Sequence, residues 1–323
     1  REVGVALIGA VSLMPKIESP GVSAALKTAL SASGWRLVGL ELTVSPAVKV
    51  QQYGILWLGD GNGAQKTLAD VATDLVVDRS YVHGQTTTNT SRCIALNSAR
   101  TSIQDSYIVE CHGRGFDSQA IVGWNGPGPY KIVNNTLQGA GENIMFGGGD
   151  PQIPGLIPSD IEIRRNYVYT PVSWKKVWTR KNLLETKNVR RMLVEGNVFE
   201  GSWADAQTGW GMIFKSSNQA GRCTWCASTD ITIRYNVMKK VGAGINLAGR
   251  EGSNPNPVGS VLSRVLIEHN VIETPGHTAG SLTYLLQRDG WLLAFCGDLV
   301  YGEGKLWSLA ATQWSYSGAE GLA

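Results

Sequence analysis

Three carboxylates of the chain could do acid–base chemistry if the fold brings them to one side. Asp117, Glu142 and Asp205 each follow one copy of a repeated strand-like segment. Pairs of carboxylates serve as acid and base in glycoside hydrolysis. The same side chains could instead accept backbone N–H groups and so cap their loops, a common role for short acidic residues in turns. Both interpretations stay open at the level of sequence, and these three residues are the predicted catalytic candidates.

Further polar and aromatic side chains in the same loops would suit a sugar ligand. Flat aromatic faces match sugar rings, although large aromatics also pack loops against a sheet. A lysine or arginine beside an acidic sugar could abstract a proton for β-elimination, with a second cation stabilising the enolate. The predicted substrate-binding residues are His112, Gln119, Trp124, Asn143, Gln207 and Lys215. Three more residues would border the same groove: Asp150, Lys187 and Arg250.

The elements that must position these residues form a repeat, which occurs seven times without gaps. Each copy alternates apolar and polar residues, breaks at Asn or Ser, and then resumes with an apolar residue, as in Ile161-Glu-Ile-Arg-Arg-Asn166-Tyr-Val168. Period-two alternation predicts a strand with one buried face. The breaking residues are Ser80, Ser106, Asn135, Asn166, Asn197, Asn236 and Asn270. A degenerate earlier copy is predicted at Trp35-Arg-Leu-Val-Gly-Leu-Glu-Leu42.

The spacing between copies varies while the core pattern stays fixed, which is typical of a solenoid with loops leaving one corner. Asn tolerates left-handed backbone angles and bonds nearby backbone, so it suits a sharp bend, and stacked Asn side chains can bond one another. Second strands are predicted after the loops, for example at Ala120–Trp124 and Met212–Lys215. The sequence therefore predicts an all-β fold, a right-handed parallel β-helix from about Trp35 to Pro275.

Several segments of this region resemble a largely uncharacterised bacterial family of the pectate-lyase-like β-helix superfamily. They include Asp117-Ser-Gln-Ala-Ile-Val-Gly-Trp-Asn-Gly-Pro-Gly-Pro-Tyr130 and Gly139-Ala-Gly-Glu-Asn-Ile-Met-Phe-Gly-Gly148. The resemblance covers roughly Leu13 to Pro275 and implies the fold, together with a secreted or periplasmic protein that acts on polysaccharides. The active-site signatures of polygalacturonases and pectate lyases are absent from the sequence, so neither of these two activities is expected.

The last fifty residues resemble something else, the C-terminal half of a metallo-β-lactamase-fold hydrolase. The matching segments are Thr274-Pro-Gly-His-Thr-Ala-Gly-Ser281 and Leu293-Ala-Phe-Cys-Gly-Asp298-Leu-Val-Tyr-Gly302. The resemblance implies that His277 and Asp298 are metal ligands. The upstream HxHxDH motif of that fold is missing, so we interpret 276–323 as an incomplete fragment with a vestigial site, joined to a β-helix domain at 1–275. Within the fragment, the Asp-Gly between two apolar runs predicts a β-hairpin of 281–287 and 291–297.

Composition excludes several classes of function. The net charge is +3 and the basic clusters are short, so no nucleic-acid partner is expected. No apolar run is long enough to span a membrane. Five cysteines are a poor disulfide framework, and Cys223-Thr-Trp-Cys226 is interpreted as a loop pair, free or disulfide-bonded. No cofactor is expected: zinc would need more ligands, and nothing indicates calcium.

The sequence predicts a β-helix that binds, and in the stronger form of the prediction cleaves, a polysaccharide or other glycan. If it cleaves, it is a lyase or a glycoside hydrolase. The alternative from another class is a non-catalytic surface or adhesion solenoid. A metallo-hydrolase is the third hypothesis, and the absence of the HxHxDH ligand motif argues against it.

Overall fold

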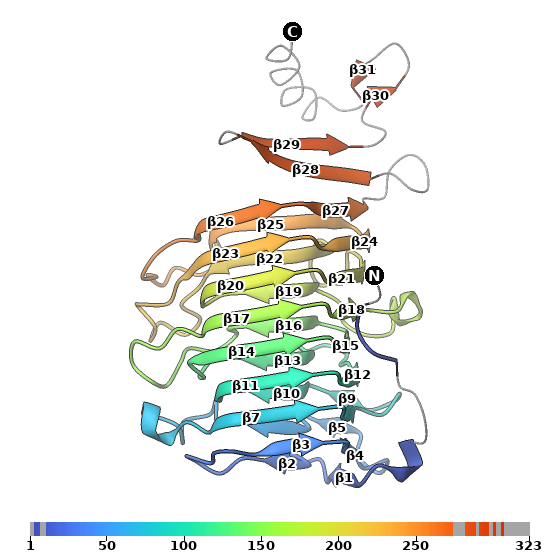
Figure 1. Cartoon of the computed structure of the whole chain (residues 1–323), viewed down its shortest axis with the longest axis vertical. Coiled ribbons are helices and arrows are strands. Elements are labelled where there is room, and N and C mark those ends of the chain that lie inside the picture. The colour runs from blue at the N-terminus through green and yellow to red at the C-terminus, as the bar shows by residue number, and fades with distance from the viewer. Residues whose placement is uncertain are drawn as a thin grey trace.

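Each coil of the chain contributes three short strands, and the strands of successive coils pair in parallel to form three long sheets (Figure 1). The computed structural model describes residues 3–6 and 11–273, together with strands at 282–288, 291–296, 300–301 and 305–306. The architecture is the predicted right-handed parallel β-helix, and its coils stack along the long axis of the molecule.

The three sheets, A, B and C, run the length of the described coils. In sheet order, sheet A contains β1 (Lys16–Ser19), β4 (Glu41–Val44), β8 (Tyr81–His83), β12 (Tyr107–Cys111), β15 (Thr136–Gly139), β18 (Tyr167–Tyr169), β21 (Val198–Ser202), β24 (Val237–Val241), β27 (Asn270–Glu273), β28 (Leu282–Arg288) and β29 (Trp291–Cys296). Sheet B contains β2 (Leu26–Lys27), β6 (Leu56–Leu58), β10 (Arg92–Leu96), β13 (Gln119–Gly123), β16 (Glu142–Phe146), β19 (Asn182–Thr186), β22 (Trp210–Ser216) and β25 (Ala243–Arg250). Sheet C contains β3 (Arg36–Val38), β7 (Thr73–Asp78), β11 (Ala99–Gln104), β14 (Gly128–Val133), β17 (Ser159–Arg164), β20 (Val189–Glu195), β23 (Ser228–Arg234) and β26 (Ser263–Glu268).

The remaining elements are short and lie in loops. Two small two-stranded pairs join β5 (Val50–Gln51) to β9 (Asn89–Thr90) and β30 (Val300–Tyr301) to β31 (Lys305–Leu306). In the described part of the chain, the single-turn 3₁₀ helices are η1 (Val11–Leu13), η2 (Leu68–Asp70) and η3 (Val172–Trp174). The degenerate copy predicted at residues 35–42 is confirmed, because it supplies β3 and β4.

The core is built from ladders of aliphatic residues at equivalent positions of successive coils. In sheet B the register pairs Ile94 with Ile121, Ile121 with Ile144 and Ile144 with Leu184, and all four side chains are fully buried. Because aliphatic side chains of similar size recur at the same position of each coil, each coil packs against the next without a change of register.

The corner between sheets C and A is held by a column of stacked polar side chains, here called the asparagine column. It runs from Ser80 and Ser106 through Asn135, Asn166, Asn197, Asn236 and Asn270. Within it, Asn135 Nδ2 donates to Asn166 Oδ1 over 3.0 Å, and Asn166 Nδ2 donates to Asn197 Oδ1 over 3.0 Å. The predicted bonding between stacked asparagines is therefore confirmed.

The left-handed residue at this corner differs from the one we expected. In each coil, the residue that precedes the column residue in the sequence adopts a positive φ. Examples are Asn134 (58°), Arg165 (53°) and Tyr235 (55°). The asparagine itself is not left-handed; its side chain bonds backbone of the neighbouring coil instead, as when Asn166 Nδ2 donates to Ile132 O over 2.8 Å. These bonds offset the strain of a left-handed residue that carries a side chain. The first residue of the pair therefore makes the bend, and the asparagine that follows it stabilises the bend.

Two disulfides close within the β-helix. Cys223 and Cys226 are bonded, which decides between the two states left open for this pair. Cys93 of β10 and Cys111 of β12 form a second disulfide with Cα atoms 5.7 Å apart. The expectation that the cysteines make a poor framework was wrong here, because folding brings two residues 18 positions apart, on strands of sheets B and A, together in the interior.

The hairpin expected near the C-terminal end is present as β28 and β29, which pair antiparallel. Strand β28 also pairs antiparallel with β27, so the hairpin continues the edge of sheet A beyond the last coil (Figure 1). The residues for which metal binding was expected, His277 and Asp298, lie outside the described residues. Among the residues that are described, no three His, Cys, Asp or Glu side chains are grouped to hold a metal ion.

Candidate functional site

A polar groove lies on the outer face of sheet B, across β10, β13 and β16. Its volume is about 460 Å³, within the range of small-molecule sites in proteins. Loops that follow the sheet B strands form its walls. The lining residues are Gly61, Asn62, Arg92, Asp117, Gln119, Val122, Trp124, Met145, Gly147, Gly148, Gly149, Asp150, Gln152 and Arg222.

Trp124 is the aromatic residue of the groove, and its position is fixed from several sides. Its backbone N–H donates to Asn97 Oδ1 over 3.0 Å, and its ring Nε1 donates to Gly61 O over 3.0 Å. A side chain at Gly61 would collide with the indole, so the close approach requires glycine there. The guanidinium of Arg92 lies 5.3 Å from the ring centroid. The groove therefore offers one fixed aromatic face beside a cation.

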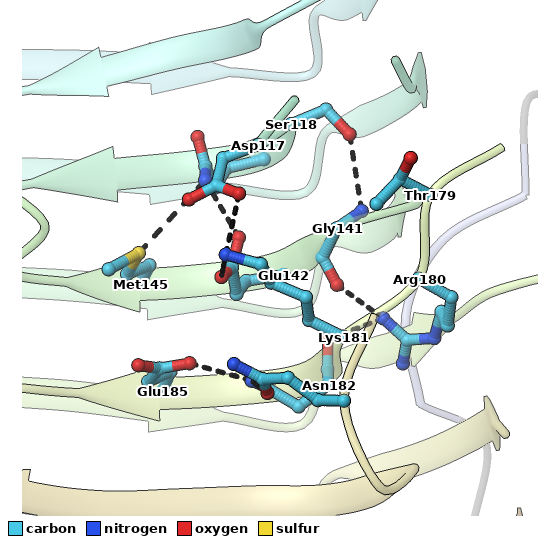
Figure 2. Close-up of polar contacts among 12 residues, drawn as sticks. Asp117, Ser118, Gly141, Glu142, Met145, Thr179, Arg180, Lys181, Asn182 and Glu185 are labelled. Carbon is cyan, nitrogen blue, oxygen red and sulfur yellow. Dashed lines mark hydrogen bonds and ion pairs between the residues drawn. The ribbon is translucent and has the colours of Figure 1, made fainter. Parts of the chain in front are cut away.

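Asp117 and Glu142, two of the predicted catalytic residues, are brought together by a lysine that the sequence analysis did not single out. Lys181 Nζ lies 2.5 Å from Asp117 Oδ1 and 3.2 Å from Glu142 Oε1 (Figure 2). Gln119 Nε2 donates to the other oxygen of Glu142 over 2.8 Å. The Asp117 side chain is 52% exposed, whereas the Glu142 side chain is fully buried. Asp117 thus faces the groove, while Glu142 lies beneath Gln119.

The environment of Glu142 favours its neutral form. Burial raises the pKa of this carboxyl to about 7, and the charge of Glu185 on the next strand adds to the effect. The ammonium of Lys181 and the bond from Gln119 act in the opposite direction but do not cancel it. Both carboxylates hold the pKa of Lys181 above its usual value, against the opposing effect of its burial. A carboxyl group that is partly protonated near neutral pH is the property that a general acid requires.

Arg180, next to Lys181, is fully buried, and its guanidinium donates hydrogen bonds to backbone carbonyl groups of neighbouring segments. Its guanidinium donates to Ala140 O, Gly141 O and Gly201 O over 2.9, 2.7 and 3.1 Å. Figure 2 shows the bond to Gly141. Burial lowers the pKa of this guanidinium to about 9. The carbonyl cage fixes the backbone from which Lys181 reaches the two carboxylates, so Arg180 acts on the site through its neighbour.

A second charged cluster continues along the same face of sheet B. Lys215 Nζ lies 3.1 Å from Glu185 and 2.8 Å from Glu251, and Lys187 Nζ lies 3.3 Å from Glu251. The pKa of Glu251 falls to about 2, because the bonds and charges of its partners outweigh the opposing effect of burial. Asn182 Nδ2, on the strand between the two clusters, donates to Glu185 Oε2 over 2.7 Å (Figure 2). The predicted residue Lys215 therefore sits in an ion-pair network rather than in the groove.

Four other predicted residues lie away from the groove. His112 is fully buried, with its ring stacked 3.9 Å from that of Trp178 and its Nε2 2.9 Å from Glu110. Asn143 is also fully buried and donates to Gly139 O and Tyr169 O. Asp205 accepts the backbone N–H of Arg180 over 2.9 Å, which is the capping role left open for it above. Gln207 accepts a bond from Asn182 over 3.1 Å.

Several polar residues of this face, among them Arg92, Lys181 and Glu185, were not predicted from the sequence. The segment at 182–186 is the sheet B strand of its coil, at the position that 142–146 and 212–215 occupy in theirs. Alignment of this strand with its neighbours would have placed Lys181 and Glu185 beside Glu142. Arg92 had a similar signal, because it stands in register with Gln119.

Comparisons with known proteins say little about this chain. No protein-family model matches the chain, and a search of curated proteins gives no match. Among solved structures, the chain is similar to the Dettilon tailspike protein, with a TM-score of 0.42 and 13% sequence identity. The match covers 87% of this chain and 64% of the tailspike chain, so the chain spans less than two thirds of that protein. Similarity at this level carries no argument about function, which has to come from the groove itself.

Proposed function

We propose that the chain binds a glycan in the groove on sheet B, with a sugar ring against Trp124. The observation that carries the proposal is the fixed indole face inside a groove that is otherwise mostly polar, with Arg92, Asp117 and Gln119 around it. Sugars present an apolar ring face and many hydroxyl groups, so they match one aromatic surface surrounded by donors and acceptors.

A glycan-binding screen with two tryptophan variants tests this proposal. Trp124→Ala removes the aromatic face of the groove, whereas Trp35→Ala removes an indole that is 62% exposed near the first coils. We expect Trp124→Ala to weaken binding of any glycan hit at least tenfold and Trp35→Ala to leave it unchanged. Equal affinity of both variants and the unaltered chain would overturn the assignment of the groove.

Cleavage of the bound glycan is a second candidate function, favoured by the raised pKa of Glu142 beside Asp117. In this proposal Asp117, which faces the groove, is the carboxyl group that contacts the glycan, and Glu142, buried beneath it, acts through Lys181, which lies between the two carboxyl groups. Glu142→Gln and Asp117→Asn should each abolish product formation, while the glycan still binds. Binding without any product from the unaltered chain would leave the chain as a non-catalytic adhesion solenoid.

We also propose that the protein works in an oxidising compartment, secreted or periplasmic. Two disulfides support this location, because such bonds persist outside the reducing cytosol. In the described part of the chain, no helix is long and apolar enough to cross a membrane. Expression directed to the periplasm should give more folded protein than expression in a reducing cytosol. Equal yields of folded protein, with the cytosolic thiols free, would contradict the proposal.

A further inference from the structure

The outer face of sheet A carries a row of tyrosines that is distinct from the groove on sheet B. Tyr81, Tyr107, Thr136 and Tyr167 occupy equivalent positions on successive coils. The rings of Tyr81 and Tyr107 are 5.9 Å apart, and Tyr167 stacks on Tyr169 at 4.7 Å. Thr136 is the one small residue in this row, so it leaves a notch between two aromatic side chains.

The N-terminal segment 3–6 of the same chain occupies this notch. Thr136 Oγ1 accepts the backbone N–H of Val5 over 3.1 Å and donates to the carbonyl of Val5 over 2.5 Å. The N–H of Gly4 donates to Arg165 O over 2.9 Å. One hydroxyl group thus satisfies both backbone groups of Val5, as a neighbouring strand would, and the segment joins two points 131 residues apart in the sequence.

The notch selects glycine at position 4. Gly4 has φ of 73°, a left-handed conformation that side-chain-bearing residues rarely adopt. A Cβ at this position would lie 2.8 Å from Thr136 Oγ1 and 2.8 Å from Tyr167 Cβ, both closer than normal contact. The backbone hydrogen bonds give the segment its affinity for the notch, and the steric fit selects glycine at position 4. Peptides that add to a sheet are recognised in the same two ways.

We propose that the tyrosine row is a docking surface for a glycine-containing peptide, and that its occupant is this chain's own segment 3–6. The docked segment acts as a strap, because it lies at the middle coils while β1, which begins at Lys16, belongs to the first coil (Figure 1). The strap therefore ties the middle coils, at Thr136 and Arg165, to the start of the β-helix. It is independent of glycan binding, since it lies on another sheet.

Amide hydrogen exchange on the full chain tests the strap. The Val5 amide, bonded to a side chain, and the Gly4 amide, bonded to backbone, should exchange at least tenfold more slowly than in a free peptide of the same sequence. Thr136→Val keeps the side-chain shape but removes the hydroxyl, and Gly4→Ala introduces the steric conflict. Both variants should return the two amides to the free-peptide rate.

The matched control is Gly63→Ala. Gly63 also has positive φ (110°), but no atom lies within 4 Å of its added Cβ. This variant carries a similar backbone penalty without a contact, so protection of Gly4 and Val5 should persist in it. Unprotected amides at residues 4 and 5 in the unaltered chain, or full protection retained in both Gly4→Ala and Thr136→Val, would overturn the proposal.

Discussion

The asparagine column and the groove on sheet B are both rows of polar side chains that run along the axis, yet they are built in opposite ways. Asn166 in the column uses its amide fully: Oδ1 accepts from Asn135, and Nδ2 donates to Ile132 O and to Asn197. On sheet B, Glu142 Oε1 beneath the groove and Asp150 Oδ1 at its edge are buried without a hydrogen-bond partner, although the ammonium of Lys181 lies 3.2 Å from the former. From Asn135 onward the column repeats one residue type, whereas the groove changes its residue type from coil to coil.

This difference separates a structural polar row from a functional one. Repetition of asparagine lets every buried donor meet an acceptor, and a satisfied buried network gives a rigid and specific corner. Unsatisfied buried groups cost stability and persist only where something compensates for them or uses them. On this argument the column determines how the coils stack, and the irregular row on sheet B is where a ligand can gain binding energy.

The largest effect is expected from Asn166→Asp, which keeps the shape of the side chain but removes its donor. Two bonds from Nδ2 become contacts between oxygens, and a charge is placed inside the column. We expect the free energy of unfolding to fall by about 4 kcal/mol at neutral pH, measured by urea denaturation. The loss should shrink as pH falls toward 4, because a protonated carboxyl can donate again. The same change at exposed Asn62 should have little effect, and a small loss at Asn166 would contradict the role of the column.

Arg180→Met tests whether buried polarity beside the groove is as necessary as that of the column. The variant leaves the carbonyls of Ala140, Gly141 and Gly201 without their donor, so we expect a loss of about 3 kcal/mol in the free energy of unfolding. Arg250→Met, at an exposed position, is the matched control. If both variants unfold at the same urea concentration, the carbonyl cage is not a structural requirement.

Glu142→Gln tests how much the buried carboxyl of Glu142 destabilises the fold when it is ionised. The measured quantity is the free energy of unfolding as a function of pH. The folded-state pKa of about 7 lies above the reference value of 4.5, so this carboxyl stabilises the fold fully below pH 4.5 and loses that contribution as pH rises through 7. The glutamine variant has no such loss. Its stability relative to the unaltered chain should therefore rise between pH 5 and pH 8, by on the order of 2 kcal/mol. The opposite slope would show that Glu142 is ionised and stabilised by Lys181.

Asp150→Asn should have the smallest effect, and a stabilising one. Asp150 Oδ2 accepts the backbone N–H groups of Ala220 and Arg222, the role that Asn125 Oδ1 performs for Gln152 and Ile153 one coil earlier. Asparagine would keep this role and place an amide where the carboxylate oxygen has no partner. We expect a gain of about 1 kcal/mol in the free energy of unfolding. A loss of stability would mean that the charge itself is required there.

The same contrast explains how much could be predicted from the sequence. The fold and the column were predictable, because Asn135, Asn166 and Asn197 recur in a fixed local pattern that the structure repeats. The pairing of Asp117 with Glu142 followed from the same register. Lys181 and Arg180 were missed because the strand that follows them, at 182–186, was not recognised as the sheet B strand of its coil. His112 was misleading for another reason: its loop position suggested exposure, while Trp174 and Trp178 cover it.

The polar groove on sheet B, and not a regular face of the β-helix, is the proposed glycan site. A crystal structure of the full chain with the best oligosaccharide from the binding screen would locate the site. We predict a sugar ring on the Trp124 indole, with hydroxyl groups within hydrogen-bonding distance of Asp117 or Arg92. An oligosaccharide bound instead on the tyrosine row of sheet A or on the outer face of sheet C, with the groove empty, would overturn this assignment.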